Sequence, residues 1–179
     1  MASLSRPSEF DFIKKYMRPL SKKEIGGGLL LDDAAVLSTK EKQSLVVTMD
    51  TLVSGVHFLE TTPPQFIASK ILRVNLSDLA AMGANPEYYT LSISIPSNYG
   101  SFDEDWFKVF SSTLKQEQNT YGITLVGGDT VSTPGPLSLT ITAFGSVKPG
   151  RALLRSKAID GDIIFVSGFI GDAWLGLAI

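Results

Sequence analysis

The feature of this sequence that most constrains its fold is one long helical segment followed at once by a strand-like segment. Over residues 65–82, apolar side chains recur with the spacing of one helix face: Ile67, Ile71, Val74 and Leu79. Pro63 and Pro64 stand where a first helical turn tolerates proline, and Gly83 marks the end of the helix. The segment that follows, 88–95, alternates like a strand. A helix that packs on a sheet is therefore expected.

Further strand-like and helix-like segments continue this pattern along the chain. Alternation or short apolar runs predict strands at 34–37, 44–53, 123–126 and 137–147, and helical spacing predicts helices at 9–20 and 102–118. The order is helix, two strands, helix, strand, helix, two strands. This order predicts an α+β fold with a mixed or antiparallel sheet flanked by helices, and it disfavours a doubly wound Rossmann sheet.

The segment 163–179 reads differently from the rest. It contains a strand-like stretch, a glycine turn and the start of an apolar helix, and no polar cap follows. We therefore expect one domain over residues 1–150, and a linker with the first elements of a second, truncated domain over 151–179.

Composition excludes several classes of function. The formal net charge is −2, with 16 Lys and Arg against 18 Asp and Glu, so nucleic acid is not an expected partner. The chain has no Cys, which excludes disulfides, thiolate nucleophiles and Cys-ligated metals and fits the reducing cytoplasm. The single histidine, His57, excludes multi-histidine metal sites. No run of about 18 apolar residues predicts a membrane span.

Several aspartates lie among apolar or small residues, where carboxylates are expected to be buried. They are Asp32 and Asp33 in LLLDDAAVL, Asp50 in LVVTMDTLV, Asp78 in NLSDLAAMG and Asp129 in LVGGDT. Clustered, buried carboxylates need a compensating cation, and Arg73 on the same predicted helix as Asp78 is one candidate. An all-oxygen ligand set favours Mg²⁺ over Ca²⁺, and substrate phosphates usually complete such a site. A nucleotide is the natural second ligand.

Each of these residues also has a structural interpretation. Aspartate is common at turns and helix N-caps. The paired glycines of LVGGDT would let backbone N–H groups approach an anion, yet turns use the same pair constantly. The glycine run 26–28 matches neither a Walker A motif nor GxGxxG. His57 suits a strand-end hydrogen bond as well as a substrate contact.

Several motifs together resemble one known family. DDAAVL, VVTMDTLVSGVHF, KILRVNLSDLAAMGANP, LVGGDT and GRALLRSKAIDGD, in this order, resemble the thiamine-monophosphate kinase family of the aminoimidazole ribonucleotide synthetase superfamily. The resemblance implies Mg²⁺-dependent transfer of the γ-phosphoryl group of ATP to thiamine monophosphate, which yields thiamine diphosphate and ADP. It also implies a homodimer whose N-terminal strands close a barrel, and a second domain over the cleft.

The resemblance implies roles for individual residues. Several Mg²⁺ ions would be held by Asp33, Thr48, Met49, Asp50, Asp78 and Asp129. ATP would contact Gly128, Asp129 and Arg155, and thiamine monophosphate would contact His57. No covalent nucleophile is implied, since positioning and charge neutralisation supply most of the catalysis of phosphoryl transfer.

The sequence departs from the family pattern at two places. Leu29, Leu30 and Leu31 precede Asp32 where the family usually has Gly-x-Gly, and Met49 stands where Thr or Ser is usual, so a metal contact there would use the backbone carbonyl. Two alternatives remain open at this stage. The chain could be an inactive nucleotide-binding and dimerisation fragment, or another ATP-dependent synthetase of the superfamily; selenophosphate synthetase is disfavoured because its reactive Cys or selenocysteine region is missing.

Overall fold

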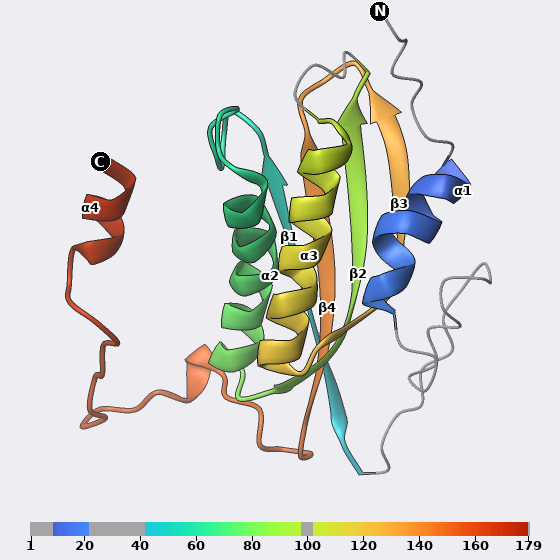
Figure 1. Ribbon diagram of the computed structural model, residues 1–179. Helices are drawn as coiled ribbons and strands as arrows, with labels where there is room; N and C mark the ends of the chain where they lie inside the picture. Colours follow the sequence, from blue (N-terminus) through green and yellow to red (C-terminus); the bar gives the residue numbers. More distant parts are fainter. Residues whose placement is uncertain (1–8, 22–41, 98–101, 179) are drawn as a thin grey trace, which may run out of the picture.

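The computed structural model describes residues 9–21, 42–97 and 102–178, and they form a four-stranded sheet with helices on one face (Figure 1). The strands are β1 (Ser44–Val53), β2 (Asn85–Pro96), β3 (Thr124–Thr133) and β4 (Ser138–Val147), in the spatial order β1-β4-β2-β3. β4 is antiparallel to β1 and β2, whereas β2 and β3 are parallel. The mixed sheet confirms the expected fold class. The strand expected at 34–37 lies outside the described residues.

Two long helices cover one face of the sheet, α2 (Pro64–Ala81) and α3 (Glu104–Tyr121) (Figure 1). α3 begins where the Asp103 carboxylate accepts a hydrogen bond of 2.8 Å from the Trp106 backbone N–H. It ends at Gly122, whose φ of 69° is a left-handed conformation that glycine adopts easily because it has no Cβ. Within the described ranges, no helix is both long and apolar enough to cross a membrane.

The N-terminal helical segment packs beside α3. It consists of α1 (Glu9–Phe12), a π-helical turn (Ile13–Met17) and a 3₁₀ turn (Arg18–Leu20). The Phe12 ring meets Phe107 edge-on at 4.8 Å, and the buried face carries Phe12, Tyr16 and Leu20. Regular α-helical spacing would place Phe10 on the same face as Ile13 and Met17, but the Phe10 side chain is 83% exposed. The π turn changes the rotation per residue, so regular α-helical spacing assigns the wrong residue.

The core lies between the helices and the strands. Inward-facing side chains of β2 and β4 are almost fully buried: Leu91, Ile93, Ile95, Leu139, Ile141 and Ala143. No described helix lies over the opposite face of the sheet (Figure 1). That helix-free face carries the exposed side chains of Leu45, Val47 and Met49 on β1 and of Val131 on β3. The sheet is therefore covered on one side only within the described residues.

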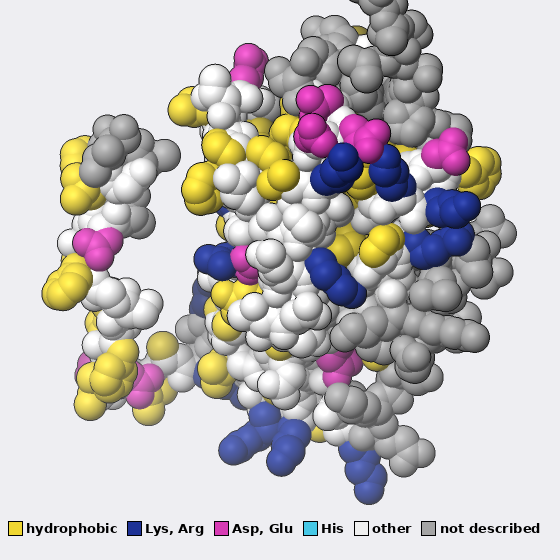
Figure 2. Space-filling model, viewed as in Figure 1, with side chains coloured by type: hydrophobic (Ala, Val, Ile, Leu, Met, Phe, Trp, Pro, Cys, Tyr) yellow, Lys and Arg dark blue, Asp and Glu magenta, His cyan; other side chains and the backbone are white. Residues whose placement is uncertain are grey.

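The segment after β4 differs from its expectation. Residues 163–166 form no strand, although the helix α4 (Asp172–Ala178) follows as expected. Apolar side chains along this segment are exposed, as Figure 2 shows, among them Ile164, Phe165 and Trp174. Strand-like sequence alone cannot form a strand, because a strand needs a hydrogen-bonding neighbour, and none pairs with it in the part of the chain that is described.

Candidate functional site

Two of the expected metal ligands lie on the helix-facing side of β1. Thr48 pairs with Ala143 of β4, and Asp50 pairs with Ile141. Both partners are fully buried under the helices, and residues directly opposite each other in an antiparallel pair point to the same face. Thr48 and Asp50 therefore point towards the helix layer. Met49 points the other way and its side chain is 64% exposed, so Met49 could join a metal site on the helix side only through its backbone.

A hydrogen bond joins this strand to α2. The Thr48 hydroxyl donates to the Asp78 carboxylate over 2.7 Å, although thirty residues separate the two in sequence. Asp50 follows two residues later on the same face of the strand, about 7 Å along it. The structure thus brings together the motifs VVTMD and NLSD, which the sequence analysis had connected only by resemblance.

The carboxylates of this region have no cationic partner in the described part of the chain. No Lys or Arg there pairs with Asp50, Asp78 or Asp129. These aspartates were expected to be buried, and this is wrong: Asp50 is half-buried, and Asp78 and Asp129 are exposed. Strand and helix edges expose carboxylates even where the neighbouring residues in sequence are apolar and point inwards.

Arg73 does not compensate Asp78. Its guanidinium instead binds Glu117 of α3 through two hydrogen bonds, Nε to Oε2 at 2.9 Å and Nη2 to Oε1 at 2.7 Å. Ser69 donates a third bond of 2.8 Å to the same carboxylate. Burial acts to raise the pKa of Glu117, but the hydrogen bonds from Arg73 and Ser69 outweigh it, so the pKa of Glu117 lies below its ordinary value.

The glycines of LVGGDT lie inside β3, so neither of them is in a turn. Gly127 pairs with Thr90 and Gly128 pairs with Leu91. A Cβ on Gly128 would stand 2.0 Å from the Leu91 carbonyl oxygen, so the close approach of β2 accounts for this glycine. The contact between the two strands therefore explains Gly128 independently of any role in binding an anion.

Asp129 lies apart from the other aspartates. It pairs with Ser92, which sits between the buried Leu91 and Ile93, and Asp129 is therefore on the helix-free face. β3 and β1 are the two edges of the sheet, separated by three strand spacings, or about 14 Å. Across the described residues, no three acidic or histidine side chains come close enough to hold one metal ion. One copy of the chain thus does not assemble the whole predicted ligand set.

The remaining predicted residues are dispersed. Asp33 lies outside the described residues. His57 is exposed after β1, and its Nδ1 accepts a 3.0 Å hydrogen bond from the Val53 backbone N–H, which leaves the Nε2–H of a neutral imidazole as a donor. The His57 carbonyl accepts a hydrogen bond from Lys70. Arg155 is exposed in a short 3₁₀ turn beyond β4.

Arg155 belongs to a basic stretch that follows β4. Lys148, Arg151, Arg155 and Lys157 are all exposed. Figure 2 shows Lys and Arg side chains at the end of the molecule where β4, α2 and α3 end, and others elsewhere on the same face. Such a surface attracts phosphate groups.

Asn75, which lies one turn before Asp78 on α2, was not among the residues expected from the sequence. Asn75 is fully buried, and its carbonyl oxygen has no hydrogen-bond partner among the described residues. A sequence signal existed. Asn75 stands four residues from both Ile71 and Leu79, so it is a polar residue in an otherwise apolar row.

The donor set gathered by β1 and α2 suits Mg²⁺. It consists of the hydroxyl of Thr48 and the carboxylates of Asp50 and Asp78, with a buried amide oxygen close in sequence. All are hard oxygen ligands, and two carboxylates without a cationic partner leave negative charge that a divalent ion would neutralise. The residues present therefore fit a magnesium ion.

Comparison with known proteins connects this arrangement to one family. Residues 31–147 match the family model described as AIR synthase related protein, N-terminal domain. The thiamine-monophosphate kinase of Escherichia coli K12 is 47% identical over 175 residues, which cover 96% of this chain and 51% of that protein. The chain thus spans about half the length of the curated relatives that it matches.

Two solved structures extend the comparison. Thiamine-monophosphate kinase from Stenotrophomonas maltophilia K279a superimposes with a TM-score of 0.67 at 44% identity, over 81% of this chain and 44% of that one. A structure described as AaThiL complexed with AMPPCP and TMP superimposes with a TM-score of 0.56 at 26% identity, over 78% of this chain and 42% of that one. The expected fold is thereby confirmed.

Proposed function

The chain belongs to the family of AIR synthase related N-terminal domains, and from this premise we propose that it is the metal- and nucleotide-binding part of a thiamine-monophosphate kinase. The observation that carries the proposal is the hydrogen bond from Thr48 to Asp78, because it joins two motifs into one all-oxygen ligand set. We assign residues 1–150 to this binding and dimerisation domain, and 151–179 to a linker and the first elements of a second domain. The lack of Cys supports a cytoplasmic location.

The proposed reaction is a single in-line phosphoryl transfer. A phosphate oxygen of thiamine monophosphate attacks the γ-phosphorus of ATP, the bond from that phosphorus to the bridging oxygen breaks, and ADP leaves with the bond's electron pair. Mg²⁺, when bound, would neutralise the charge of the assembled phosphates. Thr48, Asp50 and Asp78 would hold one ion on the helix side of β1, and Asp33, the Met49 carbonyl and Asp129 would bind the further ions that the family resemblance implies.

Residues around this set would bind the two substrates. The basic stretch that contains Arg155 suits the phosphates of ATP, and Gly128 with Asp129 would lie beside the nucleotide. His57 presents an Nε2–H donor next to the end of β1, which suits an oxygen of thiamine monophosphate. The relative described as complexed with AMPPCP and TMP supports this pair of ligands, since TMP and an ATP analogue are the two molecules bound there.

We also propose a homodimer, because one copy separates Asp129 from the other ligands. Met49 and Asp129 lie on the helix-free face at opposite edges of the sheet. Pairing the β1 edge of one copy with the β3 edge of another would continue the sheet, and a register that sets Met49 opposite Asp129 would make these two residues neighbours. It would also cover the exposed Leu45, Val47 and Val131.

The function is tested by assaying the protein, alone and joined to the remaining half found in its relatives, with ATP, Mg²⁺ and thiamine monophosphate. Formation of thiamine diphosphate by the longer protein supports the kinase, and phosphorylation of a different acceptor contradicts the substrate. If the present chain binds Mg²⁺-ATP without turnover, the chain alone is a binding and dimerisation module, which is the alternative that the sequence left open.

The dimeric site is tested by mixing two inactive variants of the longer protein, Asp78→Asn and Asp129→Asn. If each site combines Asp78 of one copy with Asp129 of the other, a mixed dimer contains one intact site, and random reassortment restores roughly a quarter of the activity, because half the dimers are mixed and each has one good site. If both residues serve the same copy, mixing restores nothing.

A further inference from the structure

Asn75 is the side chain of α2 whose hydrogen-bonding capacity the fold leaves incomplete. It is fully buried, and its Nδ2 donates to the Ile71 carbonyl over 3.0 Å. Its Oδ1 is buried and has no partner in the described part of the chain. An unsatisfied buried acceptor is costly, so such a group normally receives a donor from somewhere. For Asn75, the described neighbouring groups do not supply one.

The position of Asn75 relative to the sheet follows from its neighbour on the same row, Leu79. A Cβ built on Gly145 of β4 would lie 3.2 Å from the Leu79 side chain, so the two residues are level, that is, at the same height along the helix and strand axes. α2 and β4 run in the same direction (Figure 1). Four helical residues span about 6 Å, which equals roughly two strand residues. Asn75 is thus level with Ala143, the strand partner of Thr48.

The side chains at this level cannot satisfy the Asn75 oxygen. Ala143 has no polar atom, and the single hydroxyl proton of Thr48 is already donated to Asp78. A water molecule could donate to the oxygen, provided that it has further polar partners. Mg²⁺ keeps several waters when a protein binds it, and the hydrogens of those waters need acceptors.

We infer that Asn75 is a positioning residue of the cation site, whose carbonyl oxygen accepts a hydrogen bond from a water bound to Mg²⁺ at Thr48 and Asp78. This inference rests on the magnesium site proposed above. It differs from a purely structural role, in which a trapped water would stay on Asn75 whether or not the cation is present. The two roles make different predictions for metal binding in the absence of any reaction.

The test is calorimetric titration of the protein with Mg²⁺ alone, comparing wild type with Asn75→Leu. The variant removes the amide at similar volume, and we expect its dissociation constant for Mg²⁺ to rise about tenfold or more. Its melting temperature without metal should stay close to that of wild type, since an apolar side chain leaves no orphaned acceptor. Ser69→Ala is the matched control, because it deletes a hydrogen bond of α2 to Glu117 and should leave the affinity unchanged.

A second measurement observes Asn75 directly in the wild-type protein. In wild-type protein labelled with ¹⁵N-asparagine, the side-chain amide signal of Asn75 should shift on Mg²⁺ addition and should not shift in Asp78→Asn. An equal affinity in Asn75→Leu, or an amide signal insensitive to Mg²⁺, overturns the inference. If wild type binds Mg²⁺ and Asp78→Asn weakens it, only the role of Asn75 has failed. If wild type binds no Mg²⁺, the proposed metal site has failed as well.

Discussion

Helix α2 makes polar contacts on two sides. On one side a carboxylate is neutralised by an arginine, and on the other side a carboxylate is left without a cationic partner in the described residues. Towards α3, Arg73 and Ser69 surround Glu117, whose side chain is only 8% exposed, with hydrogen bonds and a positive charge. Towards β1, Asp78 accepts one hydrogen bond from Thr48 and has no cationic partner in the described residues. Arg73 and Asp78, which make the two contacts, lie on neighbouring turns of the same helix.

The difference separates a structural group from a functional one. Glu117 finds its compensation within the fold, so its contribution is to hold α2 against α3. Asp78 receives a neutral donor only, and its charge remains available for a ligand. A carboxylate that the fold orients without neutralising is typical of a cation site. This contrast predicts which substitutions change ligand binding and which change stability.

The largest expected effect is that of Asp78→Asn on binding of Mg²⁺-nucleotide. The amide keeps an oxygen for the Thr48 hydroxyl but removes the charge, so affinity for Mg²⁺-ATP should fall by about 100-fold or more. Thermal unfolding without metal should remain unchanged, because no cation of the described chain pairs with this carboxylate. Calorimetry and thermal unfolding measure the two quantities. Unchanged affinity would remove Asp78 from the proposed metal site.

The next effect concerns stability and the other side of the comparison. Arg73→Met keeps the aliphatic stem of the side chain but leaves the Glu117 carboxylate buried with only Ser69 as partner. We expect the free energy of unfolding to fall by about 1–3 kcal/mol, with Mg²⁺ affinity unchanged. Chemical denaturation measures the loss. A drop in metal affinity in this variant would show that the two sides of α2 are coupled.

The pH dependence of unfolding should also show that Glu117 stabilises the fold. Hydrogen bonds from Arg73 and Ser69 overcome the effect of burial and lower its pKa, so its stabilising contribution is complete above the unfolded-state pKa and is lost as pH falls through the lower folded-state pKa. Below about pH 4.3, wild type should therefore lose stability more steeply than Glu117→Gln. Denaturation midpoints across this range measure the slopes, and equal slopes would contradict the assignment.

The secondary structure was predictable wherever a periodic pattern coincided with clear start and stop residues. The strand expected at 44–53 has the bounds of β1, and the helix expected at 65–82 differs from α2 by one residue at each end. β3 extends well beyond its predicted end at 126, because Gly127 and Gly128 continue the strand against β2. Glycine favours a turn in isolation, but here the close approach of a neighbouring strand requires it.

The candidate site was predictable as a set of residues but not as an arrangement. The apolar contexts of Asp50 and Asp78 pointed to both, and the structure brings their elements together through Thr48. Neither the separation of Asp129 nor the pairing of Arg73 with Glu117 could be derived from the sequence. Both depend on strand order and helix rotation, which are set by contacts between residues far apart in sequence.

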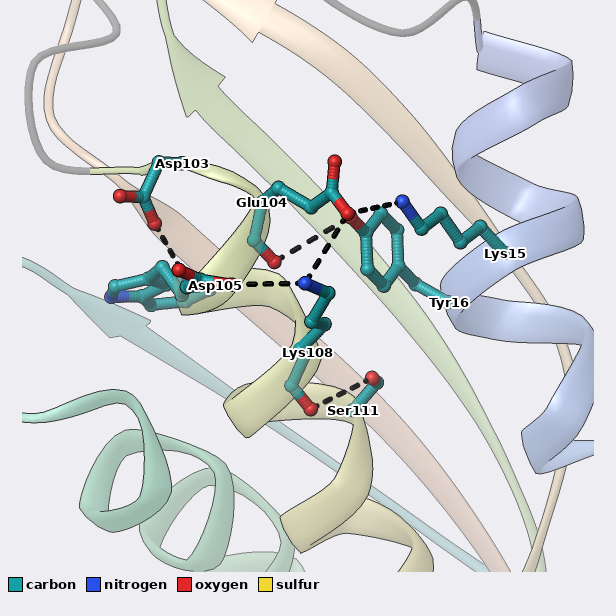
Figure 3. Close-up of polar contacts among 8 residues, drawn as sticks. Lys15, Tyr16, Asp103, Glu104, Asp105, Lys108 and Ser111 are labelled. Carbon is teal, nitrogen blue, oxygen red and sulfur yellow. Dashed lines mark hydrogen bonds and ion pairs between the residues drawn. The ribbon is translucent and has the colours of Figure 1, made fainter.

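The smallest expected effect is at a third carboxylate, Glu104, which has cationic partners but lies in water. Lys15 and Lys108 both pair with it, as Figure 3 shows, and hydrogen bonds from these two lysines lower its pKa. Solvent screens such pairs, and the ordering of long side chains offsets their attraction. Glu104→Gln should therefore leave the melting temperature unchanged within error, while the Arg73→Met variant measured beside it melts earlier. A loss comparable to that of Arg73→Met would mean that ion pairs stabilise this fold whether or not they are buried, and burial would then not distinguish Glu117 from the exposed carboxylates.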